Sequence, residues 1–166
     1  MALRNQCQLI VYPDGIGGSI SSLDDAIERY FSRVIGGVHL LPFFPSSGDR
    51  GFAPMTYDEV DPAFGSWEDV EWIAERYDLM VDLMFNHISR RSEFYRDFLA
   101  KKDESPWADL FIKSSEFWPE GRPTQEDLDL IYTRKPRPPY VEETFGDGST
   151  EKIWCTFDHE QIDLNI

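Results

Sequence analysis

The residues with the clearest potential for chemistry lie in the stretch "DLMVDLMFNHISRR", residues 78–91. Asp82 lies inside an apolar run, and Asn86 and His87 end it. A carboxylate within such a run loses water and needs a polar or charged partner. An amide and an imidazole at the end of the same run therefore indicate a polar network near a site. The alternative is a strand end that carries a hydrogen-bonded imidazole.

Further candidates follow two earlier apolar runs. Asp14 comes after the first run, and Asp49, Arg50 and Phe52 lie in the long loop after the second. Asp14 is predicted to be a turn residue, and for Asp49 the alternative is an exposed loop carboxylate. Carboxylates, an imidazole and aromatic rings suit a carbohydrate, because sugars present hydroxyls for hydrogen bonds and apolar faces for stacking.

A basic, proline-rich loop, "TRKPRPPY", stands out in this acidic sequence. It places Arg134, Lys135 and Arg137 within four positions. Guanidinium groups match the geometry of phosphate and carboxylate, so the loop is a candidate anion clamp. A solvated surface loop is the alternative.

Other chemistries find little support in the sequence. Motifs typical of P-loop nucleotide binding, dinucleotide binding, serine hydrolases and zinc proteases do not occur. His39, His87 and His159 have no metal-ligand spacing, so no metal site is expected, and His39 is predicted to be a hydrogen-bonded core or near-core residue. Glycosyl transfer needs two carboxyl groups that flank the bond being cleaved. No motif in the sequence identifies such a pair.

Charge and composition exclude several classes of partner. The 166 residues carry 31 acidic and 16 basic side chains, for a net charge of −15, so nucleic acid and anionic membrane are unlikely partners. No apolar run approaches the roughly 20 residues of a membrane span, and the first residues do not resemble a signal peptide. Cys7 and Cys155 are predicted to be reduced core thiols of a cytoplasmic protein.

The first half of the chain alternates apolar strands with amphipathic helices, which predicts a parallel sheet covered by helices. Ser22 and Ser66 are the expected N-caps of the first two helices. In such repeats ligands gather at the carboxyl ends of the strands, where most of the candidate residues lie. Strands are expected at 7–12, 36–45 and 79–85, and helices at 22–31, 66–77 and 92–101.

The second half is irregular, rich in aromatic residues and interrupted by Pro and Gly. Two strands are expected around the "GDGS" turn, and residues 161–166 form a candidate short strand. Residues 1–104 are therefore predicted to form three βα units, and residues 105–166 an insertion that returns towards them. A closed (β/α)8 barrel needs about 250 residues, so the chain would hold only the first part of one.

Three stretches together resemble one known family: "GGVHLLPFFPSSGDRGFAPMTYDEVDPAFGSWEDV", "LMVDLMFNHISRRSEFYRDFL" and "IYTRKPRPPYVEETF…WCTFDHEQIDLNI". They resemble the sucrose phosphorylase branch of the α-amylase family (glycoside hydrolase family 13), from about residue 8 to residue 166. "VDLMFNH" matches the D-x-x-x-N-H region of that family. The "GDRGFAP" form looks closer to members that act on sucrose 6'-phosphate.

The resemblance implies a fold and an activity. The fold would be the N-terminal part of a (β/α)8 TIM barrel, strands one to three, with a domain B insertion. The activity would be retaining phosphorolysis of sucrose, sucrose 6'-phosphate or another α-glucoside, which yields α-glucose 1-phosphate. Neither a metal nor an organic cofactor is implied, and inorganic phosphate would be a co-substrate.

The resemblance also assigns roles to residues of this chain. Asp49 and His87 would hold the glucosyl unit, Phe52 would stack on it, and Phe145 would lie on the acceptor side. Asp82 and Asn86 would support the site. Arg134 or Arg137 would bind phosphate or a phosphorylated acceptor.

The family's catalytic residues have no counterpart in this sequence. The nucleophile is the Asp of an R-x-D motif on strand four, the acid/base is a Glu on strand five, and a further Asp follows strand seven. The R-x-D at Arg76–Asp78 precedes strand three, which is the wrong context. The chain is therefore expected to be catalytically inactive alone and poorly soluble through exposed sheet edges.

Three alternatives stay open at this point. The chain is a non-catalytic sugar-binding module, the product of a truncated gene, or an α/β structural or interaction protein with no sugar role. A complementing C-terminal fragment is a further candidate partner.

Overall fold

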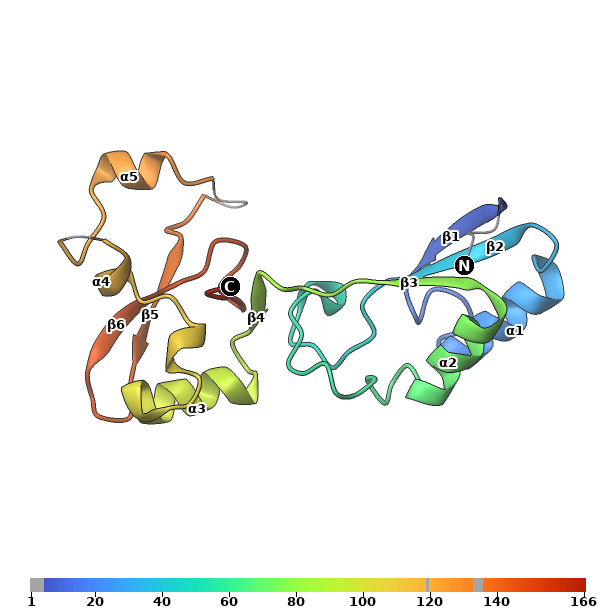
Figure 1. Ribbon diagram of the computed structural model, residues 1–166, viewed down its shortest axis with the longest axis horizontal. Helices are drawn as coiled ribbons and strands as arrows, with labels where there is room; N and C mark the ends of the chain where they lie inside the picture. Colours follow the sequence, from blue (N-terminus) through green and yellow to red (C-terminus); the bar gives the residue numbers. More distant parts are fainter. Residues whose placement is uncertain (1–4, 119, 133–135) are drawn as a thin grey trace. The chain divides into compact units, whose positions relative to one another are not determined.

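The computed structural model describes residues 5–118, 120–132 and 136–166. They divide into two compact units, which are described separately (Figure 1). Unit 1 comprises residues 1–46, 50–52 and 56–83, and unit 2 comprises residues 47–49, 53–55 and 84–166. The division falls near residue 84 because the helix at 93–101 packs in the core of unit 2. The barrel–insertion boundary at residue 104 stays a prediction.

Unit 1 contains a parallel sheet in the order β1-β2-β3. Its strands are β1 (Cys7–Val11), β2 (Ile35–Leu40) and β3 (Asp78–Val81). Leu9 pairs with Val38 and Val38 with Leu79, which confirms the predicted parallel arrangement. The second and third strands are shorter than predicted. β2 ends before Pro42, since proline cannot donate to the sheet.

Two helices connect these strands and lie on the same side of the sheet (Figure 1). They are α1 (Ile20–Tyr30) and α2 (Trp67–Arg76). Ser66 caps α2 as predicted, in a capping box with Asp69. The prediction of Ser22 as the cap of α1 is wrong: Ser19 is the last extended residue, and its hydroxyl accepts from the Ser22 amide at 3.2 Å.

The helices cover only one face of the sheet. Leu9, Val38 and Leu79 on that face pack in a core with residues of α1 and α2. On the opposite face Ile10 is 63% exposed and Met80 is 49% exposed. The prediction of a parallel sheet covered by helices is therefore confirmed for one face only, because no helix of the described part of unit 1 packs on the other.

Unit 2 has two antiparallel strand pairs and three short-to-medium helices. β4 (His87–Ser89) pairs with β7 (Gln161–Asp163), and β5 (Tyr140–Thr144) pairs with β6 (Thr150–Trp154) around the predicted "GDGS" turn. The helices are α3 (Glu93–Lys101), α4 (Ser114–Phe117) and α5 (Gln125–Asp129). Short 3-10 segments occupy 49–51, 102–104 and 108–110.

An aromatic cluster forms the centre of the unit 2 core. Phe98 of α3 lies 5.1 Å from Phe111 and 5.1 Å from Phe145, between ring centroids. Tyr95, one turn earlier, packs against the same Phe111 ring. Ile153 of β6 is fully buried beside them. No helix among the described residues is long and apolar enough to cross a membrane.

The two cysteines occupy different environments. Cys155 is buried, but Cys7 is exposed, so the prediction of two core thiols is half wrong. Cys7 begins the first strand, at the end of the sheet, where its side chain meets solvent. Burial raises the pKa of the Cys155 thiol to about 11, against the opposing effect of nearby Arg137.

This difference predicts one fast and one slow thiol. In the native chain at mildly alkaline pH, Cys7 is expected to react readily with a thiol reagent. Cys155 should react about 100-fold more slowly than in the unfolded chain, because little of it is thiolate. Timed labelling followed by mass spectrometry measures both rates, and a Cys7→Ser variant isolates the slow thiol. Equal rates at both cysteines in the native chain would contradict this structure.

Candidate functional site

Three polar side chains from separate segments of unit 2 meet in one place. The Gln161 amide nitrogen donates to Asp49 Oδ2 at 3.2 Å and lies 3.2 Å from His87 Nε2. Gln161 is 1% exposed and His87 is 3% exposed. An amide NH2 has two hydrogens, so one group can donate to both neighbours. A histidine ring whose Nε2 accepts in this way carries its proton on Nδ1 when it is neutral.

The pairing of β4 with β7 positions this trio. His87 lies opposite Asp163, and Ser89 lies opposite Gln161, so the two site-bearing strands are locked in register. The segments 47–49 and 53–55 are fixed to the same strand. Ser47 and Ser89 hydroxyls are 2.6 Å apart, and the Ser89 amide donates to the Pro54 carbonyl at 2.8 Å.

An aromatic ring lies beside the imidazole. The ring centroids of Phe157 and His87 are 4.7 Å apart, at an interplanar angle of 46°. Phe157 is 37% exposed, so part of its face is open to a ligand. A partly exposed aromatic ring next to buried hydrogen-bonding groups is typical of sugar sites.

The backbone around Asp49 adopts an uncommon conformation. Asp49 and Arg50 have φ of 50° and 54°, and Gly51 has φ of 99°. A Cβ at Gly51 would come within 2.8 Å of Pro42 Cβ and its carbonyl oxygen, so this position needs glycine. Consecutive left-handed residues cost free energy and are concentrated at functional sites.

Asp163, opposite His87, is a partly buried carboxylate. Its Oδ2 accepts from the Thr156 amide at 3.0 Å and from the Thr156 hydroxyl at 2.7 Å. Burial raises the pKa of Asp163 above its usual range, while these hydrogen bonds and the neighbouring His87 act in the opposite direction. The carboxylate adds a negative group on the strand beside the imidazole.

In unit 1, Asp82 has the partner that the sequence required. His39 Nε2 lies 2.9 Å from Asp82 Oδ2, which confirms His39 as a hydrogen-bonded residue. Asp82 follows β3 instead of lying inside it, and its side chain is 30% exposed. Asp14 lies in a turn as predicted and pairs with Arg50 at 3.1 Å.

The remaining predicted site residues are distributed over both units. Phe52 belongs to unit 1 and is partly exposed. Asn86 belongs to unit 2 and is exposed, and its backbone carbonyl accepts from the Leu164 amide. Arg137 donates to the Pro138 carbonyl at 3.1 Å and lies 3.6 Å from Cys155 Sγ. Arg134 lies outside the described residues.

Phe145 does not have the position expected of a ligand-binding residue. It is 2% exposed and packs in the unit 2 core, with Lys102 Nζ 5.5 Å from its ring centroid. A core side chain presents no surface to a ligand, which argues against the predicted acceptor-side role. The ring that lies next to His87 is Phe157 instead.

Sequence reasoning missed both Gln161 and Phe157. Each lies within the stretch "WCTFDHEQIDLNI" that carried part of the resemblance, but nothing local in that stretch assigns them a role. Among the residues that the structure describes, no group of three His, Cys, Asp or Glu side chains could hold a metal ion. The unit 2 site thus offers a carboxylate, an amide, an imidazole and a ring face, which together suit a polyhydroxylated ligand.

Comparison with known proteins places most of the chain in one family. A family model described as "Alpha amylase, catalytic domain" matches residues 30–165. The sucrose phosphorylase of Streptococcus mutans is 54% identical over the whole chain, which covers 34% of that protein. The sucrose 6(F)-phosphate phosphorylase of Thermoanaerobacterium thermosaccharolyticum is 48% identical, again over the whole chain and 35% of the relative.

Solved structures give the same result. The crystal structure of sucrose 6F-phosphate phosphorylase from Thermoanaerobacter thermosaccharolyticum matches 99% of the chain with a TM-score of 0.94 at 49% identity, over 34% of its own length. Trehalose-6-phosphate hydrolase of Bacillus licheniformis matches 98% of the chain with a TM-score of 0.76 at 19% identity, over 30% of its length, which shows the fold alone. The chain spans about a third of the length of the curated relatives it matches.

Proposed function

Because the chain belongs to the α-amylase family and has the fold of the N-terminal third of its barrel enzymes, we propose that it supplies the glucosyl-holding part of a phosphorylase site. The reaction is phosphorolysis of sucrose or a related α-glucoside, with retention of configuration and release of α-glucose 1-phosphate. Relatives named for this chemistry are 54% and 48% identical to the chain.

The observation that carries the proposal is the row of Asp49, Gln161 and His87, in which Gln161 and His87 are buried and Asp49 is exposed at its outer end. The Gln161 amide joins a carboxylate to an imidazole at 3.2 Å on each side, so the three groups are held in fixed relative positions. A glucosyl unit has adjacent hydroxyls that both donate and accept, and such a row can bind them in order. The Phe157 ring beside His87 supplies an apolar face for the sugar.

The chemical step needs groups from outside these 166 residues. Retaining transfer requires a carboxylate nucleophile and a second carboxyl group as acid/base, about 5–5.5 Å apart. The family's strand-four Asp and strand-five Glu have no counterpart in this chain, so the chain alone is proposed to bind sugar without cleaving it. A segment that complements it would supply both carboxyl groups, inorganic phosphate would be the co-substrate, and no metal or organic cofactor would take part.

The acceptor remains a choice between two chemistries. Relatives include a sucrose phosphorylase and a sucrose 6(F)-phosphate phosphorylase, and the basic loop is the candidate anion contact for a phosphorylated ketose or for phosphate itself. In this structure the Arg137 guanidinium group donates to the Pro138 carbonyl and to Cys155 Sγ. It would have to leave these partners in order to bind an anion. A cytoplasmic location is proposed as the place where the phosphorolysis product is used.

Sugar binding by the chain tests the proposal. In a 15N-labelled sample, glucose or sucrose is expected to shift the amide signals of His87 and Gln161 saturably. Asp49→Asn and His87→Ala should each weaken binding about tenfold, since the first removes the charged acceptor of the row and the second removes its buried imidazole. Asp25→Asn, an exposed change on α1, is the matched control. Binding that ignores both site variants, or no saturable shift with either sugar, would refute the proposed site.

A further inference from the structure

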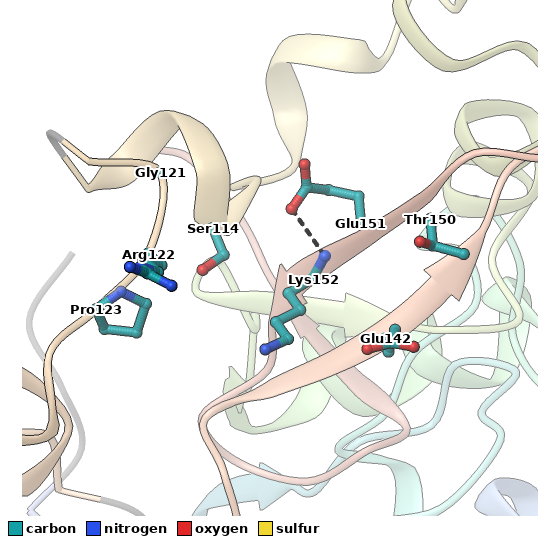
Figure 2. A pocket seen from close by; sticks show the side chains of 8 residues that line it. All are labelled: Ser114, Gly121, Arg122, Pro123, Glu142, Thr150, Glu151 and Lys152. Carbon is teal, nitrogen blue, oxygen red and sulfur yellow. Dashed lines mark hydrogen bonds between the residues drawn. The ribbon is translucent and has the colours of Figure 1, made fainter.

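Unit 2 contains a cavity that shares no residue with the Asp49–His87–Gln161 site. Its volume is about 240 Å³, and it lies between the segment that follows α4 and the β5–β6 hairpin (Figure 2). Six polar side chains line it: Ser114, Arg122, Glu142, Thr150, Glu151 and Lys152. Glu142 and Lys152 are cross-strand partners in the hairpin register.

The two positive groups of this cavity share its wall with two carboxylates, Glu142 and Glu151. Within the described residues, neither Arg122 nor Lys152 has a carboxylate ion-pair partner, although the chain carries a net charge of −15. Lys152 Nζ lies 4.6 Å from the Tyr140 ring centroid. A cation held over a ring face keeps its N–H groups available to a ligand. Figure 2 shows both side chains on the cavity wall.

The negative groups divide into one that is engaged and one that is not. Glu151 accepts from the Ser115 hydroxyl at 2.5 Å. It also accepts from the Lys152 backbone amide at 2.8 Å, the hydrogen bond drawn in Figure 2, and these neutral donors leave its negative charge in place. Glu142 has no such partner among the described residues. The cavity wall therefore has no net formal charge, but its hydrogen-bonding groups differ: Arg122 and Lys152 can donate to an oxyanion and Glu142 can accept from a hydroxyl, whereas both Glu151 oxygens are already engaged.

Two hydroxyl groups complete the wall. Ser114 is 3% exposed and begins α4, and its hydroxyl makes no hydrogen bond to another described residue. Thr150 begins β6 and directs its hydroxyl towards the cavity in Figure 2. Hydroxyls and the Glu142 carboxylate are suited to ligand hydroxyl groups, while a guanidinium and an ammonium group are suited to an oxyanion.

We propose that this cavity binds a small polyhydroxy anion, a sugar ring or open polyol chain that carries one carboxylate or phosphate group. Arg122 and Lys152 receive the oxyanion, and Glu142 accepts from a ligand hydroxyl. Sites for drug-sized ligands measure about 300–1,000 Å³, so a cavity slightly smaller than that range suits one monosaccharide unit. The site is separate from the glucosyl-holding site and does not depend on the proposed function.

Titration of the 15N-labelled chain with three matched compounds tests this site. Gluconate and glucose 6-phosphate carry an oxyanion on a polyol, whereas glucose lacks the charge. At least one of the two anions is expected to shift the amides of Thr150 and Lys152 saturably, and glucose at the same concentration should leave them unchanged. A response to gluconate alone identifies a carboxylate site, and a response to glucose 6-phosphate alone identifies a phosphate site.

Variants separate a built site from general charge attraction. Lys152→Gln and Arg122→Gln are each expected to weaken anion binding about tenfold, as loss of one charge-assisted hydrogen bond predicts. Lys101→Gln removes the same charge from α3 and should have no effect. The amide spectrum of each variant shows whether unit 2 is folded. Equal shifts with glucose, unchanged binding in Lys152→Gln, shifts confined to His87 and Gln161, or no saturable shift with either anion would overturn the proposal.

Discussion

Replacing Glu143 with alanine is expected to destabilise unit 2 by about 3–5 kcal/mol, which is the usual cost of removing one partner of a buried ion pair. Glu143 is 7% exposed. Arg90 contacts both of its oxygens, Nε with Oε1 at 2.7 Å and Nη2 with Oε2 at 2.8 Å, and the Tyr95 hydroxyl donates to Oε1 at 3.1 Å. The loss is comparable with the whole stability of a small domain.

The cost arises from the groups that Glu143 would leave behind. Burial raises the pKa of the Tyr95 hydroxyl, so it stays a protonated donor without an acceptor. In the intact chain the hydrogen bond with Glu143 raises the pKa of Arg90. Without Glu143 the guanidinium group still keeps its charge, as arginine does in proteins, and loses its counter-ion. Both groups lie in or beside the aromatic core that holds α3 in place.

Urea unfolding, followed by aromatic circular dichroism, measures this effect. Glu142→Ala is the matched control, since Glu142 is the preceding residue of β5 and is exposed. An exposed substitution of this kind is expected to change the unfolding free energy by about 0.5 kcal/mol or less. A similar midpoint for the parent chain and Glu143→Ala would show that the Arg90–Glu143–Tyr95 network does not stabilise unit 2.

His87→Ala is expected to lower phosphorolysis about 100-fold when the chain forms part of a complete enzyme. The test protein joins these 166 residues to the remaining two thirds of the Streptococcus mutans sucrose phosphorylase, which is 54% identical over the shared segment. His87 is 3% exposed and held by Gln161. Loss of a strong polar contact with the sugar, with the amide left unpaired, corresponds to about two orders of magnitude in kcat/KM.

The control for this variant is His159→Ala. The His159 side chain is 63% exposed and pairs with Asp158 at the surface, so its removal should leave kcat/KM unchanged. Initial rates of glucose 1-phosphate formation at several sucrose concentrations give kcat and KM for both variants. If His87→Ala retained the activity of the joined parent enzyme, the imidazole would not hold the sugar.

Local sequence patterns predicted unit 1 well because its elements are determined by near neighbours. Ser66 and Asp69 form the expected capping box of α2, and the apolar runs at 7–12 and 36–45 form adjacent parallel strands. The cap of α1 was misassigned because Ser19 and Ser22 are both good caps, and only the extended backbone of Ser19 separates them. A hydrophobic pattern identifies the apolar side chains of a strand but not the elements that pack on them. The exposure of Ile10 could therefore not be predicted from the sequence.

The unit 2 site was only half predictable for a different reason. His87 and Asp49 follow apolar runs in a βα pattern, and that position is enriched in ligand-binding residues. Gln161 lies 74 positions from His87, and an antiparallel pair of three-residue strands brings them together. No local pattern reports such a pairing. The same limitation explains the choice of Phe145, which packs in the core, over Phe157, which lies against the imidazole.

The residues of the unit 2 site are proposed to hold a glucosyl unit while other parts of a barrel cleave it. The direct test is phosphate-dependent release of glucose 1-phosphate from sucrose, measured for the 166-residue chain alone and for the joined enzyme. We expect no release by the chain alone and release by the joined enzyme, because only the latter contains the carboxylate pair. Clear release of glucose 1-phosphate by the chain alone would show that its own residues cleave the glycosidic bond, and this division of roles would be wrong.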